Sequence, residues 1–95
     1  MQIITKKRVK DFSAHHAGAA NAMYAWCKIV AGARWESFDG LRQLFPSADL
    51  VDGLVVFNIG GNKVRLIAGI DFKFKRVYVK EIHTHAEYSK RKNKL

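Results

Sequence analysis

The chain has 95 residues and a formal net charge of +9, with 48% hydrophobic and 26% charged residues. This length predicts a single domain over residues 1–95 with one modest core, and the apolar content argues against a disordered chain. No apolar run approaches the roughly 18 residues of a membrane span, and Met1–Ile4 is too short for a signal sequence. The lone Cys27 excludes an intrachain disulfide, so we expect a cytoplasmic protein.

Positive charge is concentrated in the last third of the chain. Residues 1–59 contain seven Lys or Arg and five acidic residues, which gives a net charge of +2. Residues 60–95 contain ten Lys or Arg and three acidic residues, which gives a net charge of +7. A concentrated positive field attracts a polyanion such as nucleic acid or an anionic membrane. The charges alternate with aromatic residues and a histidine pair, which favours a binding surface over a merely solubilising one.

The first third of the chain predicts a short strand followed by two helices. Met1–Ile4 is apolar and partly β-branched, as in a strand at an edge or against a later sheet. Lys6 to about His15 fits a helix with Thr5 as its N-cap. Ala17–Ala31 is an alanine-rich helix with Gly32 as its C-terminal cap. Its inward stripe, at helical spacing, consists of Ala19, Met23, Trp26, Cys27 and Val30.

Residues 34–53 are expected to form a connector, with a helical turn over Ser37–Arg42 and a tight turn at Asp52-Gly53. Three strands should follow: Leu54–Ile59, Lys63–Ile70 and a third through residues 76–80. Gly60-Gly61-Asn62 predicts the hairpin between the first two, and residues 71–75 contain a less distinctive loop.

Alternation along these strands predicts two different sheet faces. Val64, Leu66, Ala68 and Ile70 share one side of their strand, and Val77 and Val79 suit the same side of the next. The opposite surface is then cationic with one aromatic, and it carries Lys63, Arg65, Arg76, Tyr78 and Lys80. The chain is therefore predicted to be α+β: two N-terminal helices packed on one face of a small, mainly antiparallel β-sheet, with a short C-terminal helical turn near Glu87.

Two segments carry a family resemblance that covers most of the chain. They are the run from Val56 to Ile67, which contains F-N-x-G-G-N-K-x-R-L, and the run T-H-A-E-Y at Thr84–Tyr88. Together they resemble the HigB-type toxins of type II toxin–antitoxin systems, which belong to the RelE-like superfamily of mRNA interferases. The family pattern often continues with Asp where this chain has Ser89, and His83 is not part of the pattern.

The resemblance implies a RelE-like fold and a toxin that inhibits translation and growth. Its activity would be that of a metal-independent endoribonuclease, without a cofactor, that cuts translated mRNA in the ribosomal A site of bacteria. The implied partners are mRNA, the ribosome and a HigA-type helix-turn-helix antitoxin, which would carry the complex to operator DNA.

The matching positions imply a catalytic set of Arg65, His85 and Tyr88. A histidine suits proton transfer near neutral pH, an arginine can hold two phosphate oxygens, and a tyrosine can stack on a splayed base. Which group is acid and which is base stays open. The residues expected to bind RNA are Asn62, Lys63, Arg76, Lys80, Lys90, Arg91 and Lys92, the last three in a basic tail at about 89–95.

Other interpretations of the same residues remain. Tyr88 could pack the last turn against the sheet, and Lys80 could pair with Glu81 or Glu87. His83 and His85, if both lie in a strand, would point the same way and could contribute two zinc ligands, without a convincing third. The chain could instead be a non-catalytic RNA- or ribosome-binding module that uses the basic face, or an adaptor for an acidic protein.

Overall fold

The computed structural model describes residues 1–61 and 63–94, and for 91–94 it describes the backbone alone. The elements in chain order are β1 (Gln2–Ile4), α1 (Lys6–His15), α2 (Ala17–Gly32), α3 (Phe38–Leu44), β2 (Asp49–Val51), β3 (Leu54–Ile59), β4 (Val64–Asp71), β5 (Arg76–Thr84) and α4 (His85–Lys94). The strands form one sheet in the order β1-β5-β4-β3-β2. The pair β1–β5 is parallel and the other pairs are antiparallel, so the predicted α+β class with a mainly antiparallel sheet is confirmed.

The turns between the strands follow their residue chemistry. Asp52 and Gly53 have φ angles of 52° and 80°, which suit the two-residue hairpin turn between β2 and β3. Gly60 and Gly61 also have positive φ, as expected for the break before β4, whereas Asn62 lies outside the described residues. In the β4–β5 turn, the Asp71 carboxylate accepts a hydrogen bond from the Phe74 amide at 2.9 Å.

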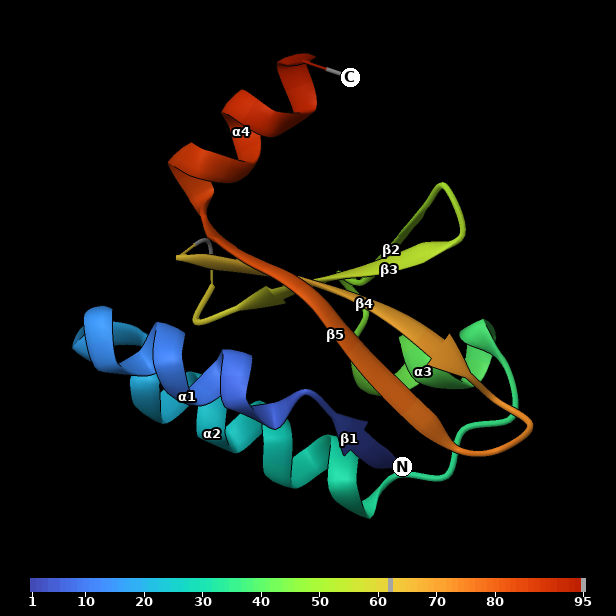
Figure 1. Ribbon diagram of the computed structural model, residues 1–95. Coiled ribbons are helices and arrows are strands. Elements are labelled where there is room, and N and C mark those ends of the chain that lie inside the picture. The colour runs from blue at the N-terminus through green and yellow to red at the C-terminus, as the bar shows by residue number, and fades with distance from the viewer. Residues whose placement is uncertain (62, 95) are drawn as a thin grey trace.

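Helices α1 and α2 lie side by side on one face of the sheet (Figure 1). The predicted α2 stripe is confirmed, because all five of its residues are buried in the core cluster. Burial raises the pKa of the Cys27 thiol, which fits an inert core residue. The helix ends one residue later than expected, so Ala33 rather than Gly32 is the capping residue.

Phe57 of β3 is the centre of the aromatic core. Its ring meets Trp26 of α2 and Phe45 of the connector, both edge-on with centroids 5.2 Å apart. The connector between α2 and β2 is pinned to the same core by Trp35 and by Leu41 of α3. Helix α3 is longer than the predicted turn, and the Ser37 hydroxyl caps it by accepting a bond from the Gly40 amide.

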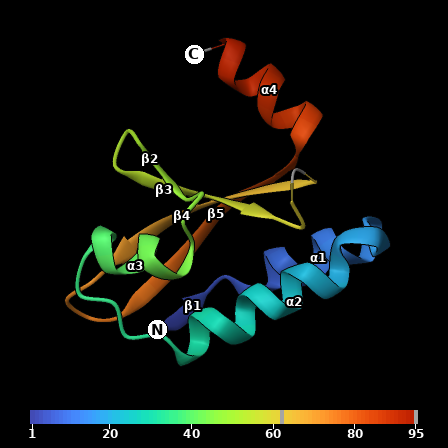
Figure 2. The ribbon, with the colours of Figure 1, turned by 180° about the vertical axis from the view of Figure 1, so that it is seen from behind.

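Three local predictions were wrong. Thr5 has φ 68°, in the left-handed region, and its side chain makes no capping bond; its carbonyl accepts the Arg8 amide instead as the chain turns from β1 into α1. The connector contains a short strand, β2, that was not predicted. The expected helical turn and basic tail are one continuous helix, α4, which leaves the sheet on the side opposite α1 and α2 (Figures 1 and 2).

A β-bulge decides which face the end of β5 presents. Ala68 pairs with Val79 but Ile67 pairs with Glu81, so Lys80 is an extra residue. The bulge shifts the alternation by one, so that Ile82 joins Val79 and Val77 on the core side. Glu81 and His83 therefore lie on the face away from α1 and α2, which we call the open face. None of the helices in the described part of the chain is long and apolar enough to cross a membrane.

Candidate active site

Arg65 lies in β4 on the open face of the sheet. Its cross-strand partners are Asn58 of β3 and His83 of β5, so the three side chains form one row across the sheet. Only 9% of the Arg65 surface is exposed, which is unusual for an arginine and indicates that its neighbours hold the side chain in place. One of these contacts is a bond from Nη1 to the Val64 carbonyl at 3.4 Å.

Arg65 and His85 are in direct contact. The Arg65 Nη2 atom lies 3.1 Å from Nδ1 of His85, the first residue of α4. A guanidinium can only donate, so Nδ1 of His85 must be the acceptor, and the ring proton is on Nε2. The two residues that the sequence placed twenty positions apart therefore form one unit at the start of α4.

A capping box places His85. The Glu87 amide donates to the Thr84 hydroxyl at 3.2 Å, and the Thr84 amide donates to the Glu87 carboxylate at 2.8 Å. These reciprocal bonds satisfy amides at the start of α4 and set its direction as β5 ends. The Lys63 carbonyl accepts the His85 amide at 3.1 Å, which ties the helix start to the β3–β4 turn.

Tyr88 follows one turn later and lines the same cavity as the Arg65–His85 pair. The cavity has a volume of about 280 Å³. Its lining is mainly polar and consists of Ser47, Asp49, Val56, Asn58, Arg65, His85, Tyr88 and Ser89. A smaller cavity is also lined by Tyr88, together with Val51, Asp52, Leu54, Val56 and Ile67. Tyr88 and Val56 thus line both cavities, which leaves space beside Tyr88 for a planar group.

The predicted RNA-binding residues are dispersed. Lys80 lies on the open face, with its ammonium 5.5 Å from the centre of the Tyr78 ring. Arg76 is exposed at the opposite end of β5, where its guanidinium is 5.6 Å from the Phe74 ring, so it is remote from Arg65 along the strand. Lys90 is exposed on α4. Asn62 and the side chains of Arg91 and Lys92 lie outside the described residues.

The expectation that Lys63 shares the face of Arg65 was wrong. The strand begins at Val64, so the alternation does not extend back to Lys63. Its side chain lines a separate cavity with Ala19 of α2 and with Thr84, on the side of the sheet that the helices cover.

The zinc interpretation of His83 and His85 fails on geometry. His83 is in β5 and His85 is in α4, so their rings do not share the spacing of a strand. Within residues 1–61 and 63–94, no group of three or more His, Cys, Asp or Glu is placed to hold a metal ion.

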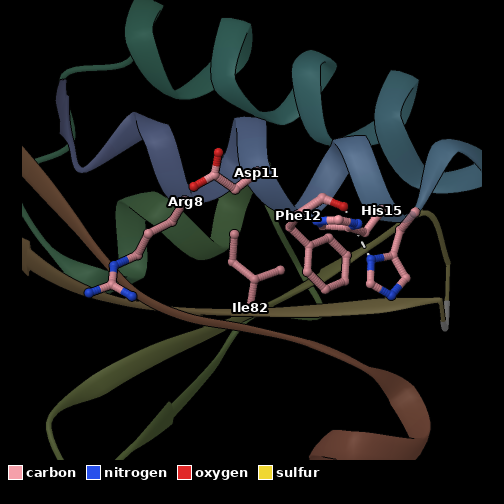
Figure 3. Close-up of a pocket in the computed structure, with 6 residues that line it drawn as sticks. Arg8, Asp11, Phe12, His15 and Ile82 are labelled. Carbon is pink, nitrogen blue, oxygen red and sulfur yellow. Dashed lines mark hydrogen bonds between the residues drawn. The ribbon is translucent and has the colours of Figure 1, made fainter.

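Another cavity, of about 300 Å³, lies between α1 and β5 on the covered side of the sheet (Figure 3). Ile82 points from β5 toward Phe12 (Figure 3). The Phe12 ring stacks on His16 with centroids 3.9 Å apart. His16 also donates from Nδ1 to the Phe12 carbonyl at 3.1 Å, a bond at the end of α1. This hydrogen bond and this stacking give His16 a structural role. The cavity shares no lining residue with the one beside Arg65 and His85, so it is a separate site.

Sequence reasoning missed part of this site. Asn58, Ser47 and Asp49 line the cavity, and none of them was predicted. Asn58 could have been found from the predicted hairpin, because it lies directly opposite Arg65 in the pairing of β3 with β4. Asp49 belongs to β2, which the sequence did not predict, and Ser47 lies in the turn just before that strand.

Residues 19–91 match the family described as HigB_toxin, RelE-like toxic component of a toxin-antitoxin system. This chain belongs to the HigB toxin family. A relative from Escherichia coli strain K12, named mRNA interferase toxin HigB, is 32% identical over 91 residues, which are 93% of this chain and 88% of that protein. An mRNA interferase HigB from Escherichia coli O6:H1 is 31% identical over 93 residues, 95% of this chain and 90% of that protein.

Membership of the HigB family confirms the resemblance read from the two motifs. The match includes both the β3–β4 hairpin and the T-H-A-E-Y run, the segments that meet in the Arg65–His85 contact. In the second motif the structure separates two tasks: Thr84 and Glu87 form the capping box, while His85 and Tyr88 line the cavity.

Loss of the capping box is expected to loosen α4 without unfolding the core. Thr84→Ala removes the hydroxyl that accepts the Glu87 amide, and this should cost about 1 kcal/mol of local helix stability. Amide hydrogen exchange in α4 should accelerate while that of β3 stays slow. Thr84→Ser keeps the hydroxyl and serves as the control; equal exchange in both variants contradicts the capping role.

The capping box should also make α4 sensitive to acid. Bonds from the Thr84 amide and hydroxyl lower the pKa of Glu87. The ionised carboxylate therefore stabilises α4 above its unfolded-state pKa, and this contribution is lost as the pH falls through the lowered pKa. Protection of the α4 amides should decline on acidification, and Glu87→Gln should remove that decline. A decline of the same size in Glu87→Gln contradicts this assignment.

Proposed function

We propose that this chain is an mRNA interferase, an endoribonuclease that cuts translated mRNA and so inhibits translation and growth. The carrying observation is the 3.1 Å contact between Arg65 and His85 in an open cavity on the uncovered face of the sheet. A permanent cation and a group that transfers protons are the two requirements for cleaving a phosphodiester next to a 2′-hydroxyl. The names of the E. coli relatives point to the same activity.

In the proposed reaction, RNA supplies its own nucleophile. The 2′-oxygen attacks the neighbouring phosphorus, and the bond to the 5′-oxygen breaks. Arg65 stabilises the extra negative charge on the phosphate oxygens, since its guanidinium stays charged throughout. His85 moves a proton at the reacting atoms. Because the substrate provides the nucleophile and the side chains provide the proton transfer, this chemistry needs no metal.

Tyr88 is proposed to stack on the base beside the scissile bond. Tyr88 lines two neighbouring cavities, and a planar base that enters either of them can pack against its ring. Lys80 of β5 and Lys90 of α4 are exposed and should hold the phosphate backbone. The segment Lys90–Lys92 would also face ribosomal RNA if cutting takes place in the A site.

The proposed partners follow from the family. A toxin of a toxin–antitoxin system is neutralised by its antitoxin, which we propose is a HigA-type helix-turn-helix protein that carries the complex to operator DNA. A toxin that acts on translated mRNA at the ribosome would work in the bacterial cytoplasm, which is the location we propose.

Brief induction of the wild-type protein, followed by primer extension on several messages, tests the proposal. An mRNA interferase arrests growth and creates new 5′ ends inside translated regions. A non-catalytic RNA-binding module arrests translation without new 5′ ends, and an adaptor for an acidic protein keeps its partner after nuclease treatment. Growth arrest without new 5′ ends overturns the proposed activity.

A further inference from the structure

His83 and Glu81 form a second polar pair on the open face. The Nε2 atom of His83 lies 2.9 Å from a carboxylate oxygen of Glu81, and both residues follow the bulge at Lys80 in β5. About a quarter of the His83 side chain is exposed, so it is reachable from solvent. His83 is also the cross-strand partner of Arg65, which places its Cβ about 5 Å from that of Arg65.

The bulge is what brings this pair to the open face. In an unbroken strand, Glu81 and His83 would fall on the same side as Val79 and point into the core. The extra residue Lys80 turns both onto the open face, where His83 is paired with Arg65 and Glu81 is paired with Ile67. Bulges commonly redirect a side chain at the edge of a functional site.

Both histidines carry their ring proton on Nε2, but they differ in whether the Nδ1 lone pair is available to accept a proton. An ionised carboxylate only accepts, so the His83 proton is on Nε2 and its Nδ1 has a free lone pair. His85 uses its Nδ1 lone pair for the Arg65 guanidinium and keeps a proton on Nε2. In this arrangement His83 is ready to accept a proton, with Glu81 beside it to stabilise the imidazolium that results.

We infer that His83 is the general base of the reaction and that Glu81 is its positioning residue. The inference rests on the proposed nuclease activity. Nδ1 of His83 takes the proton from the 2′-hydroxyl, and the 2′-oxygen forms its bond to phosphorus. The bond from phosphorus to the 5′-oxygen breaks with its electron pair, and that oxygen takes a proton from Nε2 of His85. The products are a 2′,3′-cyclic phosphate and a 5′-hydroxyl end.

His85 becomes the acid once the substrate is bound. The phosphate competes for the Arg65 guanidinium, which releases Nδ1 of His85 to take up a second proton. The His85 imidazolium then has a proton on Nε2 to give to the leaving oxygen. Without His83 the 2′-hydroxyl would keep its proton, and without His85 the leaving 5′-oxygen would receive none.

Single-turnover cleavage of a message on programmed ribosomes tests this division. Two substrates are compared at the mapped cleavage site: the normal phosphodiester, and one in which sulfur replaces the leaving 5′-oxygen. A sulfur leaving group needs no proton, so it rescues the loss of the acid but not the loss of the base. His83→Ala should slow cleavage by about 10²–10⁴-fold on both substrates. His85→Ala should be slow on the normal substrate and largely restored on the sulfur one.

Two further measurements separate a catalytic from a structural role. His83→Ala should abolish the rise of kcat/KM with pH that reports deprotonation of the base, and Glu81→Gln should lower the rate while leaving KM unchanged. His15→Ala, which changes an exposed histidine at the end of α1, is the matched control.

The outcomes distinguish this inference from the proposed function. Wild-type rates in His83→Ala, or its rescue by the sulfur substrate, overturn the assignment of His83 as base while the nuclease activity stands. Absence of cleavage by the wild-type protein instead overturns the proposed function itself.

Discussion

Arg65→Ala is expected to abolish growth arrest and to slow RNA cleavage by about 10²–10³-fold. The guanidinium is the buried cation of the site, and it is held beside His85 by a bond of 3.1 Å. It would meet the phosphate as negative charge develops, so its loss should lower kcat and kcat/KM together. Arg65→Lys keeps the charge without the forked geometry and should recover only part of the rate.

The controls for Arg65 address charge and folding. Arg8→Ala removes the same charge from the exposed surface of α1, on the other side of the sheet, and should keep the wild-type rate. Circular dichroism and thermal unfolding should show that Arg65→Ala remains folded, since the hydrophobic core lies on the opposite face of β4. Full toxicity of a folded Arg65→Ala variant contradicts its role.

His85→Ala is expected to reduce cleavage by about 10²–10⁴-fold, the range for removal of a proton-transfer group. The residue is exposed at the first position of α4, so its loss should scarcely change the free energy of unfolding. Binding of RNA should be nearly unchanged, because the basic residues that attract the backbone remain. The measurement is the single-turnover cleavage rate beside the dissociation constant for the same RNA.

His15→Ala is the matched control for His85, since His15 is an exposed histidine at the end of a helix remote from the cavity. Equal losses in the two variants, or a loss in His85→Ala confined to RNA affinity, would show that His85 binds rather than transfers a proton.

Much of the fold follows from patterns within single elements. The α2 stripe is visible because burial repeats at helical spacing, and the strand Leu54–Ile59 lies between two turns rich in glycine. The Arg65 side of β4 follows from strict alternation in an unbroken strand. Family resemblance then adds His85 and Tyr88, and the structure brings these residues to one cavity.

The remaining features depend on contacts between elements. The bulge at Lys80 arises because Ile82 belongs with the core, and alternation alone places Glu81 and His83 on the wrong face. The strand β2 has only three residues and exists because β3 offers it a partner. The length of α4 was hidden by its charged composition, although Thr84 and Glu87 have the spacing of a capping box.

The central claim is that Arg65 and His85 act on one phosphodiester as a unit. The most direct test is the single-turnover cleavage rate of the double variant Arg65→Ala/His85→Ala beside each single variant. Residues that act as a unit give non-additive losses, so the double variant should be about as slow as the slower single variant. A double variant that is slower by the product of the two single losses would show that the two side chains act independently, and this would contradict the account.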